Sequence, residues 1–370
     1  MKVLVTGADG FIGKNLCLRL SEDESVLVTP FTRSNSRGDL ASLVADADAV
    51  VHLAGENRPD NLAAFEQVNV GLTRGVCDAI NAAGKAIPLI LASSAQAELE
   101  NLYGKSKFAA EQEVRTLARD CGNPVAVYRL PGVFGKWCKP NYNSVVATFC
   151  HNVANDLPIQ ISDPAREIKL VYIDDVVNNF IHWLKAPGAG FQWQAVAPEY
   201  DVTLGALAEQ IKAFGNCRTS LVSERVGAGF VRALYATYVS YLPRDRFVYD
   251  LPVHGDERGV FVEMLKTPDA GQFSFFTAHP GITRGGHYHH SKTEKFLVIK
   301  GQARFGFRHM NTGEMFYLNT CGDKPQIVET VPGWTHDITN IGESEMIVML
   351  WANEIFDRER PDTIACKVKS

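Results

Sequence analysis

Three features that the sequence lacks narrow its class before any motif is considered. The 370 residues include 37 Lys and Arg against 42 Asp and Glu, so the positive excess of a nucleic-acid or membrane-surface protein is missing. No apolar run approaches the roughly 20 residues that a transmembrane helix needs. The eight cysteines are scattered without a Cys-x-x-Cys pair, which predicts reduced thiols in a cytoplasmic protein and no disulfide framework.

The organisation of the chain follows from its length and pattern. No signal peptide is expected, because residues 2–6 already have the pattern of a buried strand. The composition, 46% hydrophobic and 21% charged, excludes a disordered chain, and 370 residues are too many for one ordinary core. Helices and strands alternate up to a linker at 242–246, and short strands and turns follow it. We therefore predict an α/β domain over residues 1–243 and an all-β domain over 244–370.

Three glycines directly follow the first predicted strand. Gly7, Gly10 and Gly13 have the spacing Gly-x-x-Gly-x-x-Gly, and residues 14–20 are predicted to be a helix. Glycines at such places permit a tight turn, a close approach of the backbone to a pyrophosphate, and close helix–strand packing. The N-terminus of the helix then faces the phosphates. A strand before the turn and a helix after it favour a dinucleotide site over a simple glycine turn.

The end of the next predicted strand, residues 26–31, bears on which dinucleotide binds. An NAD site normally has Asp or Glu there, accepting hydrogen bonds from the ribose hydroxyls. Here Thr32, Arg33 and Ser34 follow the strand, and Arg37 is close behind. Hydroxyls and cations suit a 2′-phosphate, so the sequence favours NADPH. The alternative is that both arginines belong only to a solvated basic turn.

A Tyr-x-x-x-Lys pair opens a later helix rich in Ala and Glu. Tyr103 and Lys107 are four residues apart and share one face of that helix, and the strand before it ends in Ser93-Ser94. An ammonium beside a phenol lowers the pKa of the phenol. The phenol can then pass a proton to a carbonyl oxygen as hydride reaches the carbon, while a Ser hydroxyl binds the same oxygen.

This order of glycine turn, Ser and Tyr-x-x-x-Lys resembles the extended short-chain dehydrogenase/reductases. The resemblance implies a Rossmann-type fold and a catalytic set of Ser94, Tyr103 and Lys107. Residues 125–135 resemble the strand and loop that these enzymes use around nicotinamide and substrate, and loop 136–143 is either a nucleotide-sugar contact or a surface loop. The cofactor-binding residues implied are Gly7, Gly10, Phe11, Ile12, Gly13, Thr32, Arg33, Leu53, Ala54 and Lys107.

A second set of chemical groups lies in the all-β half. His287 and His289 are two residues apart, which places both imidazoles on the same face of a strand. Glu294 and His336 complete a mixed nitrogen and oxygen set that suits a catalytic divalent ion better than a closed structural site. We interpret these four residues as metal ligands, with zinc as the ion. The alternative is that they are satisfied polar groups inside a barrel.

Glycines frame this set in the order Gly, His-x-His, Glu, Gly, which resembles the first motif of the cupin family and implies a C-terminal cupin barrel. Residues 253–263 also resemble the Asp-x-Arg-Gly-x-Phe segment of deoxysugar 3,5-epimerases, which are cupins without a metal. Asp256 and Arg258 are either part of such a segment or a strand-edge ion pair. Candidates for a base near the histidine motif are Tyr288, His290 and Lys295.

A short-chain reductase followed by a cupin resembles, over the whole chain, a family of bifunctional capsular polysaccharide enzymes. The resemblance implies a UDP-linked 4-keto-6-deoxy-HexNAc substrate, epimerised at C3 in the cupin domain and then reduced at C4 with NADPH. The product would be UDP-2-acetamido-2,6-dideoxy-β-L-talose, on the path to N-acetyl-L-fucosamine for capsule or O-antigen. A homodimer is expected, because an apolar barrel sheet is a usual dimer surface. Two alternatives stay open: a single-function reductase whose cupin only dimerises or binds sugar, and a nucleotide-sensing regulator.

Overall fold

The computed structural model describes residues 1–59, 61–252, 254–256, 259–261, 265, 271–354 and 359–369, with only the backbone for 254–256, 259–261 and 272–274. The chain divides into two compact units, one comprising Met1–Phe134 with Ile168–Asp201 and the other Gly135–Glu167 with Val202–Ser370. The second unit thus contains residues on both sides of position 243. The domain boundary at 243/244 stays a prediction.

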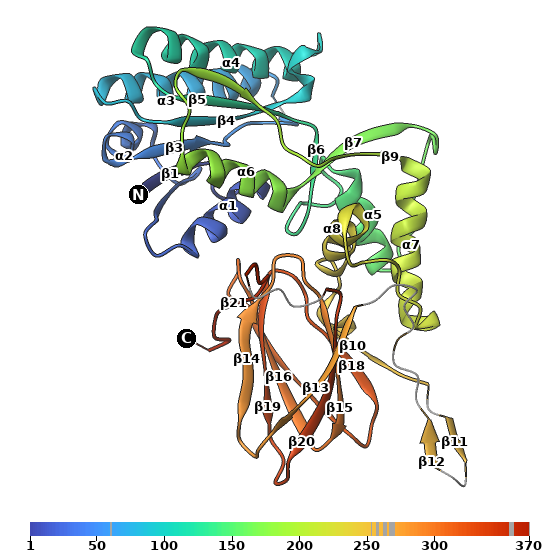
Figure 1. Ribbon diagram of the computed structural model, residues 1–370. Helices are drawn as coiled ribbons and strands as arrows, with labels where there is room; N and C mark the ends of the chain where they lie inside the picture. Colours follow the sequence, from blue (N-terminus) through green and yellow to red (C-terminus); the bar gives the residue numbers. More distant parts are fainter. Residues whose placement is uncertain are drawn as a thin grey trace. The chain divides into compact units, whose positions relative to one another are not determined.

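A six-stranded parallel sheet forms the centre of the first unit (Figure 1). Its strands are β1 (Lys2–Thr6), β2 (Leu27–Phe31), β3 (Ala49–His52), β4 (Leu89–Ser94), β5 (Val125–Leu130) and β8 (Phe191–Gln194). The order β2-β1-β3-β4-β5-β8 reverses between β1 and β3. Ligands of such sheets bind at this switch point, outside the carboxyl ends of the strands.

Helices cover both faces of this sheet. They are α1 (Phe11–Ser21), α2 (Leu40–Asp46), α3 (Gly71–Ala82), α4 (Leu102–Cys121) and α6 (Ile173–Lys185). Helices α2, α3 and α4 form one layer, and α1 and α6 form the other (Figure 1). The strands are buried on both faces and are therefore continuously apolar, as in the fully buried Val3-Leu4-Val5 of β1. The predicted Rossmann-type α/β fold is confirmed.

A smaller sheet completes the first unit. It has the order β6-β7-β9, from β6 (Gly132–Phe134), β7 (Glu167–Tyr172) and β9 (Glu199–Thr203). The ring of Phe134 packs against Tyr172 and Tyr200, with centroids 5.4 and 6.5 Å apart. Strand β6 follows β5 directly in the chain, so this sheet begins beside the carboxyl edge of the large sheet.

Two antiparallel five-stranded sheets dominate the second unit. One has the order β10-β18-β15-β20-β13, from β10 (Val248–Asp250), β13 (Gln272–Ala278), β15 (Glu294–Lys300), β18 (Gln326–Glu329) and β20 (Met346–Ala352). The other has the order β17-β16-β19-β14-β21, from β14 (Thr283–Tyr288), β16 (Gln302–His309), β17 (Met315–Cys321), β19 (Trp334–Asn340) and β21 (Ile364–Ala365). Phe305 and Phe307 of β16 face the interior with Phe296 of β15. The predicted all-β C-terminal domain is confirmed.

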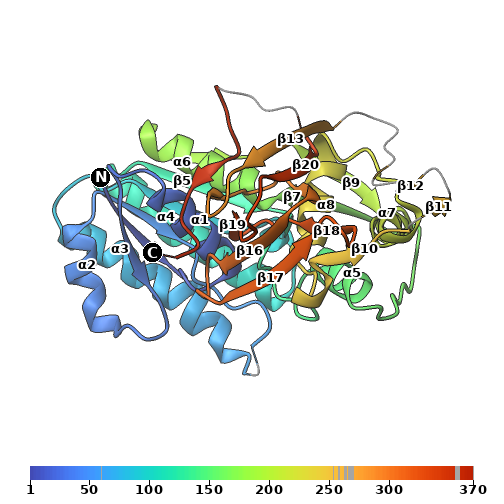
Figure 2. The ribbon, with the colours of Figure 1, turned by 90° about the horizontal axis from the view of Figure 1, so that it is seen from below.

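A hairpin of β11 (His254–Asp256) and β12 (Gly259–Phe261) lies apart from these sheets in both views (Figures 1 and 2). Asp256 ends β11, but Arg258 lies outside the described residues, so the structure does not decide between an epimerase-like segment and an ion pair.

Helices α5 (Val145–Ala154), α7 (Leu204–Ser220) and α8 (Gly229–Val239) pack together in the second unit. Ion pairs attach them to the β-sheets: Arg218 of α7 pairs with Glu329 of β18. The predicted linker forms one short helical turn, Arg244–Arg246. All eight cysteines are free. Among the described residues, every helix is too short or too polar to cross a bilayer.

Candidate active sites

The glycine turn lies at the switch point of the parallel sheet. Gly7 follows β1 with φ +68°, and a Cβ there would lie 2.7 Å from the amide nitrogen of Ala54, which follows β3. A Cβ on Gly13 would lie 2.2 Å from the carbonyl oxygen of Gly7. No larger residue fits either position. Gly10 caps α1, so the first N–H groups of that helix are directed at the turn. This arrangement fits the pyrophosphate of a dinucleotide.

The structure places an acidic residue, Glu56, in the predicted cofactor region, and the sequence analysis did not identify it. Arg33, whose guanidinium is 90% exposed, pairs with the Glu56 carboxylate, and Arg37 donates a hydrogen bond to the carbonyl oxygen of Gln67 at 2.9 Å. Thr32 Oγ1 lies 2.7 Å from Ser34 Oγ. Glu56 follows β3 rather than β2, so no pattern at the end of β2 could reveal it.

The structure brings Tyr103 and Ser94 into contact, whereas Lys107 bonds elsewhere. Tyr103 and Lys107 are one turn apart on α4, and a hydrogen bond joins Tyr103 to Ser94 at the end of β4. Burial raises the pKa of Tyr103, and the Ser94 hydrogen bond opposes that rise. The predicted lowering of this pKa by Lys107 is wrong for this structure. The Nζ of Lys107 instead donates to the carbonyl oxygen of Ala92 at 2.7 Å, and burial lowers the pKa of Lys107 to about 8.

The buried side-chain amide of Asn69 connects the segment after β3 to helix α4. Asn69 Oδ1 accepts from the backbone N–H of Glu56 at 2.7 Å, and its Nδ2 donates to Ser106 Oγ at 2.9 Å. Ser106 Oγ in turn donates to the carbonyl oxygen of Tyr103 at 2.7 Å. Asn69 is 2% exposed and lies in a short π-helical turn, Phe65–Val70. Its polar contacts come from segments distant in sequence, so no local pattern could reveal them.

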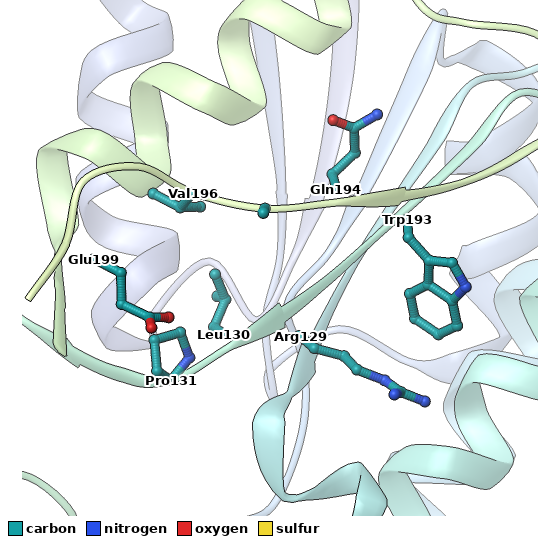
Figure 3. A pocket seen from close by; sticks show the side chains of 8 residues that line it. Arg129, Leu130, Pro131, Trp193, Gln194, Val196 and Glu199 are labelled. Atoms are coloured by element: carbon teal, nitrogen blue, oxygen red, sulfur yellow. The ribbon is translucent and has the colours of Figure 1, made fainter. Parts of the chain in front are cut away.

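A pocket of about 360 Å³ lies at the carboxyl ends of β5 and β8 (Figure 3). The Arg129 guanidinium stacks over the Trp193 ring at 4.4 Å, and Arg129 is held by Glu111 and Glu98. Leu130 pairs in register with Ser94, so the pocket begins beside the end of β4. It lies in the segment predicted to surround nicotinamide and substrate. Its lining is Arg129, Leu130, Pro131, Trp193, Gln194, Ala195, Val196 and Glu199.

The second unit assembles the four predicted metal ligands. The imidazole nitrogens of His287, His289 and His336 and a carboxylate oxygen of Glu294 all lie within 4.8 Å of one another. His287 is on β14, His336 is its register partner on β19, and Glu294 opens β15. A register shift between Gly285 and His287 adjusts β14 just before the ligands.

The hydrogen bonds of these ligands fit a divalent ion. His289 Nδ1 bonds to the carbonyl oxygen of Asp362, which leaves Nε2 as the lone-pair nitrogen of the neutral ring. That Nε2 lies 3.1 Å from Glu294 Oε2, so two acceptors face each other unless a proton or a cation lies between them. Both ring nitrogens of His336 are buried and lack a hydrogen bond to any described group.

The pKa shifts of these residues also fit a divalent ion. Burial lowers the pKa of His287 to about 3 and also lowers the pKa of His336, so both rings are neutral ligands. Although burial opposes it, the neighbouring imidazoles of His289 and His336 hold the pKa of Glu294 well below its usual range. Neutral imidazoles with one carboxylate match a catalytic zinc-type donor set.

Neighbouring lysines take different roles. Lys292, missed from sequence, places its Nζ 2.9 Å from Glu294 Oε1. Lys295 points to the opposite face of β15 and pairs with Glu329, which raises the pKa of Lys295 well above its usual value despite burial. Lys295 is therefore no longer a candidate base. Tyr288 and His290 pack ring to ring, with centroids 5.6 Å apart.

Loop 136–143 is not simply a surface loop. Lys136 is 1% exposed, and a Cβ on Gly333 would lie 2.8 Å from the ring of Trp137. Tyr241 also donates a hydrogen bond to the carbonyl oxygen of Cys138. Gly333 is three residues before His336, so the loop packs on the strand start that carries a predicted ligand.

Two family models match the chain in succession. The NAD dependent epimerase/dehydratase family matches residues 3–196, more than half of the chain. The chain belongs to the NAD dependent epimerase/dehydratase family. Membership implies a nicotinamide cofactor, which the glycine turn fits. The polysaccharide biosynthesis C-terminal domain matches residues 254–364, which include the four metal-type ligands.

Full-length relatives share both parts of this family member. A UDP-2-acetamido-2,6-beta-L-arabino-hexul-4-ose reductase from Pseudomonas aeruginosa is 58% identical over 368 residues, covering 100% of this chain and 99% of the relative. The capsular polysaccharide assembling protein CapF from Staphylococcus aureus is 40% identical, with a TM-score of 0.68 and full coverage of both chains. UDP-glucuronic acid 4-epimerase from Bacillus cereus, 18% identical with a TM-score of 0.53 over 58% of this chain and 84% of its own, shows the fold alone. The chain is thus CapF-like throughout.

Proposed function

We propose that this protein is a bifunctional nucleotide-sugar enzyme of capsular polysaccharide synthesis. It epimerises C3 of a UDP-linked 4-keto-6-deoxy-HexNAc with the β-domain site and then reduces C4 with NADPH, forming UDP-2-acetamido-2,6-dideoxy-β-L-talose. The observation that carries the proposal is 58% identity over the whole chain to a reductase named for a hexul-4-ose. The two sets of side chains in this chain supply groups suited to both steps.

The reduction depends on Tyr103 remaining protonated until it is needed. Burial raises the pKa of Tyr103, so at neutral pH the phenol carries the proton that the C4 oxygen takes up. Ser94, bonded to Tyr103, is placed to donate to the same oxygen. Bound NADPH supplies the hydride. We propose NADPH over NADH because Arg33 is exposed and can turn from Glu56 to a 2′-phosphate.

The epimerisation uses the acidity of the C3 proton beside the C4 ketone. His287, His289, Glu294 and His336 would hold a divalent ion, which we propose to be zinc, supplying a Lewis acid for charge developing on the substrate oxygen. CapF, 37% identical with a TM-score of 0.63, has been solved with the inhibitor 3-isopropenyl-tropolone.

We also propose a homodimer. Phe275 on the edge strand β13 is 71% exposed, and edge strands with exposed apolar side chains pair readily with a second copy. Light scattering of the wild type and of Phe275→Glu tests this. Each copy in that dimer would contain both proposed domains, the reductase domain of residues 1–243 and the cupin domain of residues 244–370.

Mass spectrometry of products from a panel of UDP-4-keto sugars in deuterated water tests the function. Without NADPH, we expect one deuterium at C3 of the recovered sugar. With NADPH, the C4 ketone should also be reduced, with one hydrogen added to C4 and one to its oxygen. Reduction without any deuterium at C3 would favour the single-function reductase with a non-catalytic cupin, and the absence of NADPH turnover would favour a sensing role.

A further inference from the structure

The C-terminal segment forms part of the wall of the metal-type site. Its Asp362 uses both its backbone and its carboxylate. The carbonyl oxygen accepts from His289 Nδ1. Asp362 Oδ1 accepts from the N–H of His290 at 2.8 Å, and Oδ2 accepts from the N–H groups of Ser291 and Lys292 at 2.8 and 2.7 Å. Ser291 Oγ adds a further contact at 3.1 Å.

We propose that Asp362 is a positioning residue for the metal site, an inference that rests on the proposed function. By accepting a hydrogen bond from Nδ1–H, the carbonyl group fixes the tautomer in which His289 Nε2 offers its lone pair to an ion. By gathering three consecutive N–H groups, the carboxylate fixes the turn that follows His289. One residue therefore acts on both: its backbone carbonyl orients His289, and its carboxylate, the only group that Asp362→Ala removes, fixes the path of the chain to Glu294.

The same turn also places the ammonium group of Lys292 beside Glu294, another predicted ligand. It ends at Lys292, whose buried Nζ lies 2.9 Å from Glu294 Oε1, while Glu294 Oε2 faces the histidines. If the turn were released, Lys292 would no longer orient that carboxylate. The segment after Asp362 acts on a third ligand, because Ala365 of β21 is the register partner of His287 on β14.

Asp362 is itself held from helix α8. Arg232 of α8 pairs with Glu354 at 2.7 Å and lies 3.8 Å from Asp362 Oδ2. The side chains of Arg232 and Asp362 are 29% and 15% exposed, so solvent screens this contact only in part. A residue from the part of the chain predicted to belong to the reductase thus supports the metal site.

The test is metal affinity, measured by chelator competition on the full-length protein, together with the visible spectrum of the Co²⁺-loaded protein. Asp362→Ala should bind Zn²⁺ about 10- to 100-fold more weakly and show an altered Co²⁺ spectrum. Asp362→Asn should lose less, because its amide keeps one acceptor oxygen. Arg232→Gln should lose less still, because it acts through Asp362.

Asn340→Ala is the matched control. Asn340 is also buried in this unit and makes three hydrogen bonds, to Ala278, Gly342 and Ser344, none of them with a ligand. This variant should lose thermal stability but keep the wild-type Zn²⁺ affinity. If Asp362→Ala binds Zn²⁺ no more weakly than Asn340→Ala, the positioning role is overturned while the metal site stands. If wild type binds no divalent ion, the metal site of the proposed function falls, and the positioning role with it.

Discussion

Lys295 and Glu329 are register partners on β15 and β18 and form a buried ion pair, with side chains 2% and 5% exposed. Arg218 of α7 pairs with the other oxygen of the same carboxylate. Removing the carboxylate would leave Lys295 and Arg218 without an anionic partner. We therefore expect Glu329→Gln to lower the free energy of unfolding by about 3–5 kcal/mol, measured by urea denaturation.

A double variant separates the charge effect from a general loss of packing. In Glu329→Gln/Lys295→Met one buried cation is gone, so part of the lost stability should return. If Glu329→Gln alone lowers the free energy of unfolding by less than about 1 kcal/mol, solvent reaches the ion pair. The variant Lys295→Met should also keep C3 proton exchange, because Lys295 faces away from the metal-type site.

The two proposed reactions should separate at Tyr103. Tyr103→Phe removes the proton donor, so NADPH oxidation should fall about 10²- to 10⁴-fold. Exchange of the C3 proton with solvent should continue at the wild-type rate, because it uses the histidine site. Stopped-flow absorbance and deuterium uptake measure the two rates. Tyr128→Phe is the control: this buried phenol on β5 bonds to the carbonyl oxygen of Asn179 and should leave both rates unchanged.

Loss of exchange in Tyr103→Phe would contradict two independent sites. Equal loss of NADPH oxidation in Tyr128→Phe would show that any buried tyrosine change in this sheet disturbs reduction. The second result would remove Tyr103 as the specific proton donor.

What the sequence revealed about the sites was local. The glycine turn and the four-residue interval from Tyr103 to Lys107 each lie within one turn, and His287 and His289 are two residues apart at the end of β14, with His289 just beyond it. Backbone periodicity places such neighbours without knowledge of the rest of the chain. The fold class followed for the same reason, since continuously apolar strands alternating with helices indicate a parallel sheet.

What the sequence did not reveal depends on contacts between distant segments. Asp362 reaches His289 from 73 residues away, and Asn69 reaches Ser106 across 37. The expected effect of Lys107 on the pKa of Tyr103 failed because the Lys107 ammonium donates a hydrogen bond to the carbonyl oxygen of Ala92, on β4. Lys295 looked like a candidate base because it adjoins Glu294, yet adjacent residues on a strand face opposite sides.

The cofactor preference should depend on Arg33. Arg33→Ala removes the cation proposed to bind the 2′-phosphate, so the KM for NADPH should rise about 10- to 100-fold, as expected for the loss of a charge-assisted contact. The KM for NADH should stay within about twofold. Arg74→Ala, which breaks the surface pair with Glu113 on α4, is the control and should change neither value. An unchanged KM for NADPH in Arg33→Ala would support the solvated basic turn.

The buried ammonium of Lys107 should make stability depend on pH in a defined window. Burial lowers its pKa from 10.5 to about 8, so between these values the unfolded chain holds one more proton and the wild type gains stability as pH rises. Lys107→Met lacks this term. Its unfolding free energy minus that of wild type should therefore fall by about 3 kcal/mol from pH 7 to pH 10.5, in chemical denaturation at each pH. Parallel profiles for the two proteins would show that Lys107 keeps an ordinary pKa in the fold.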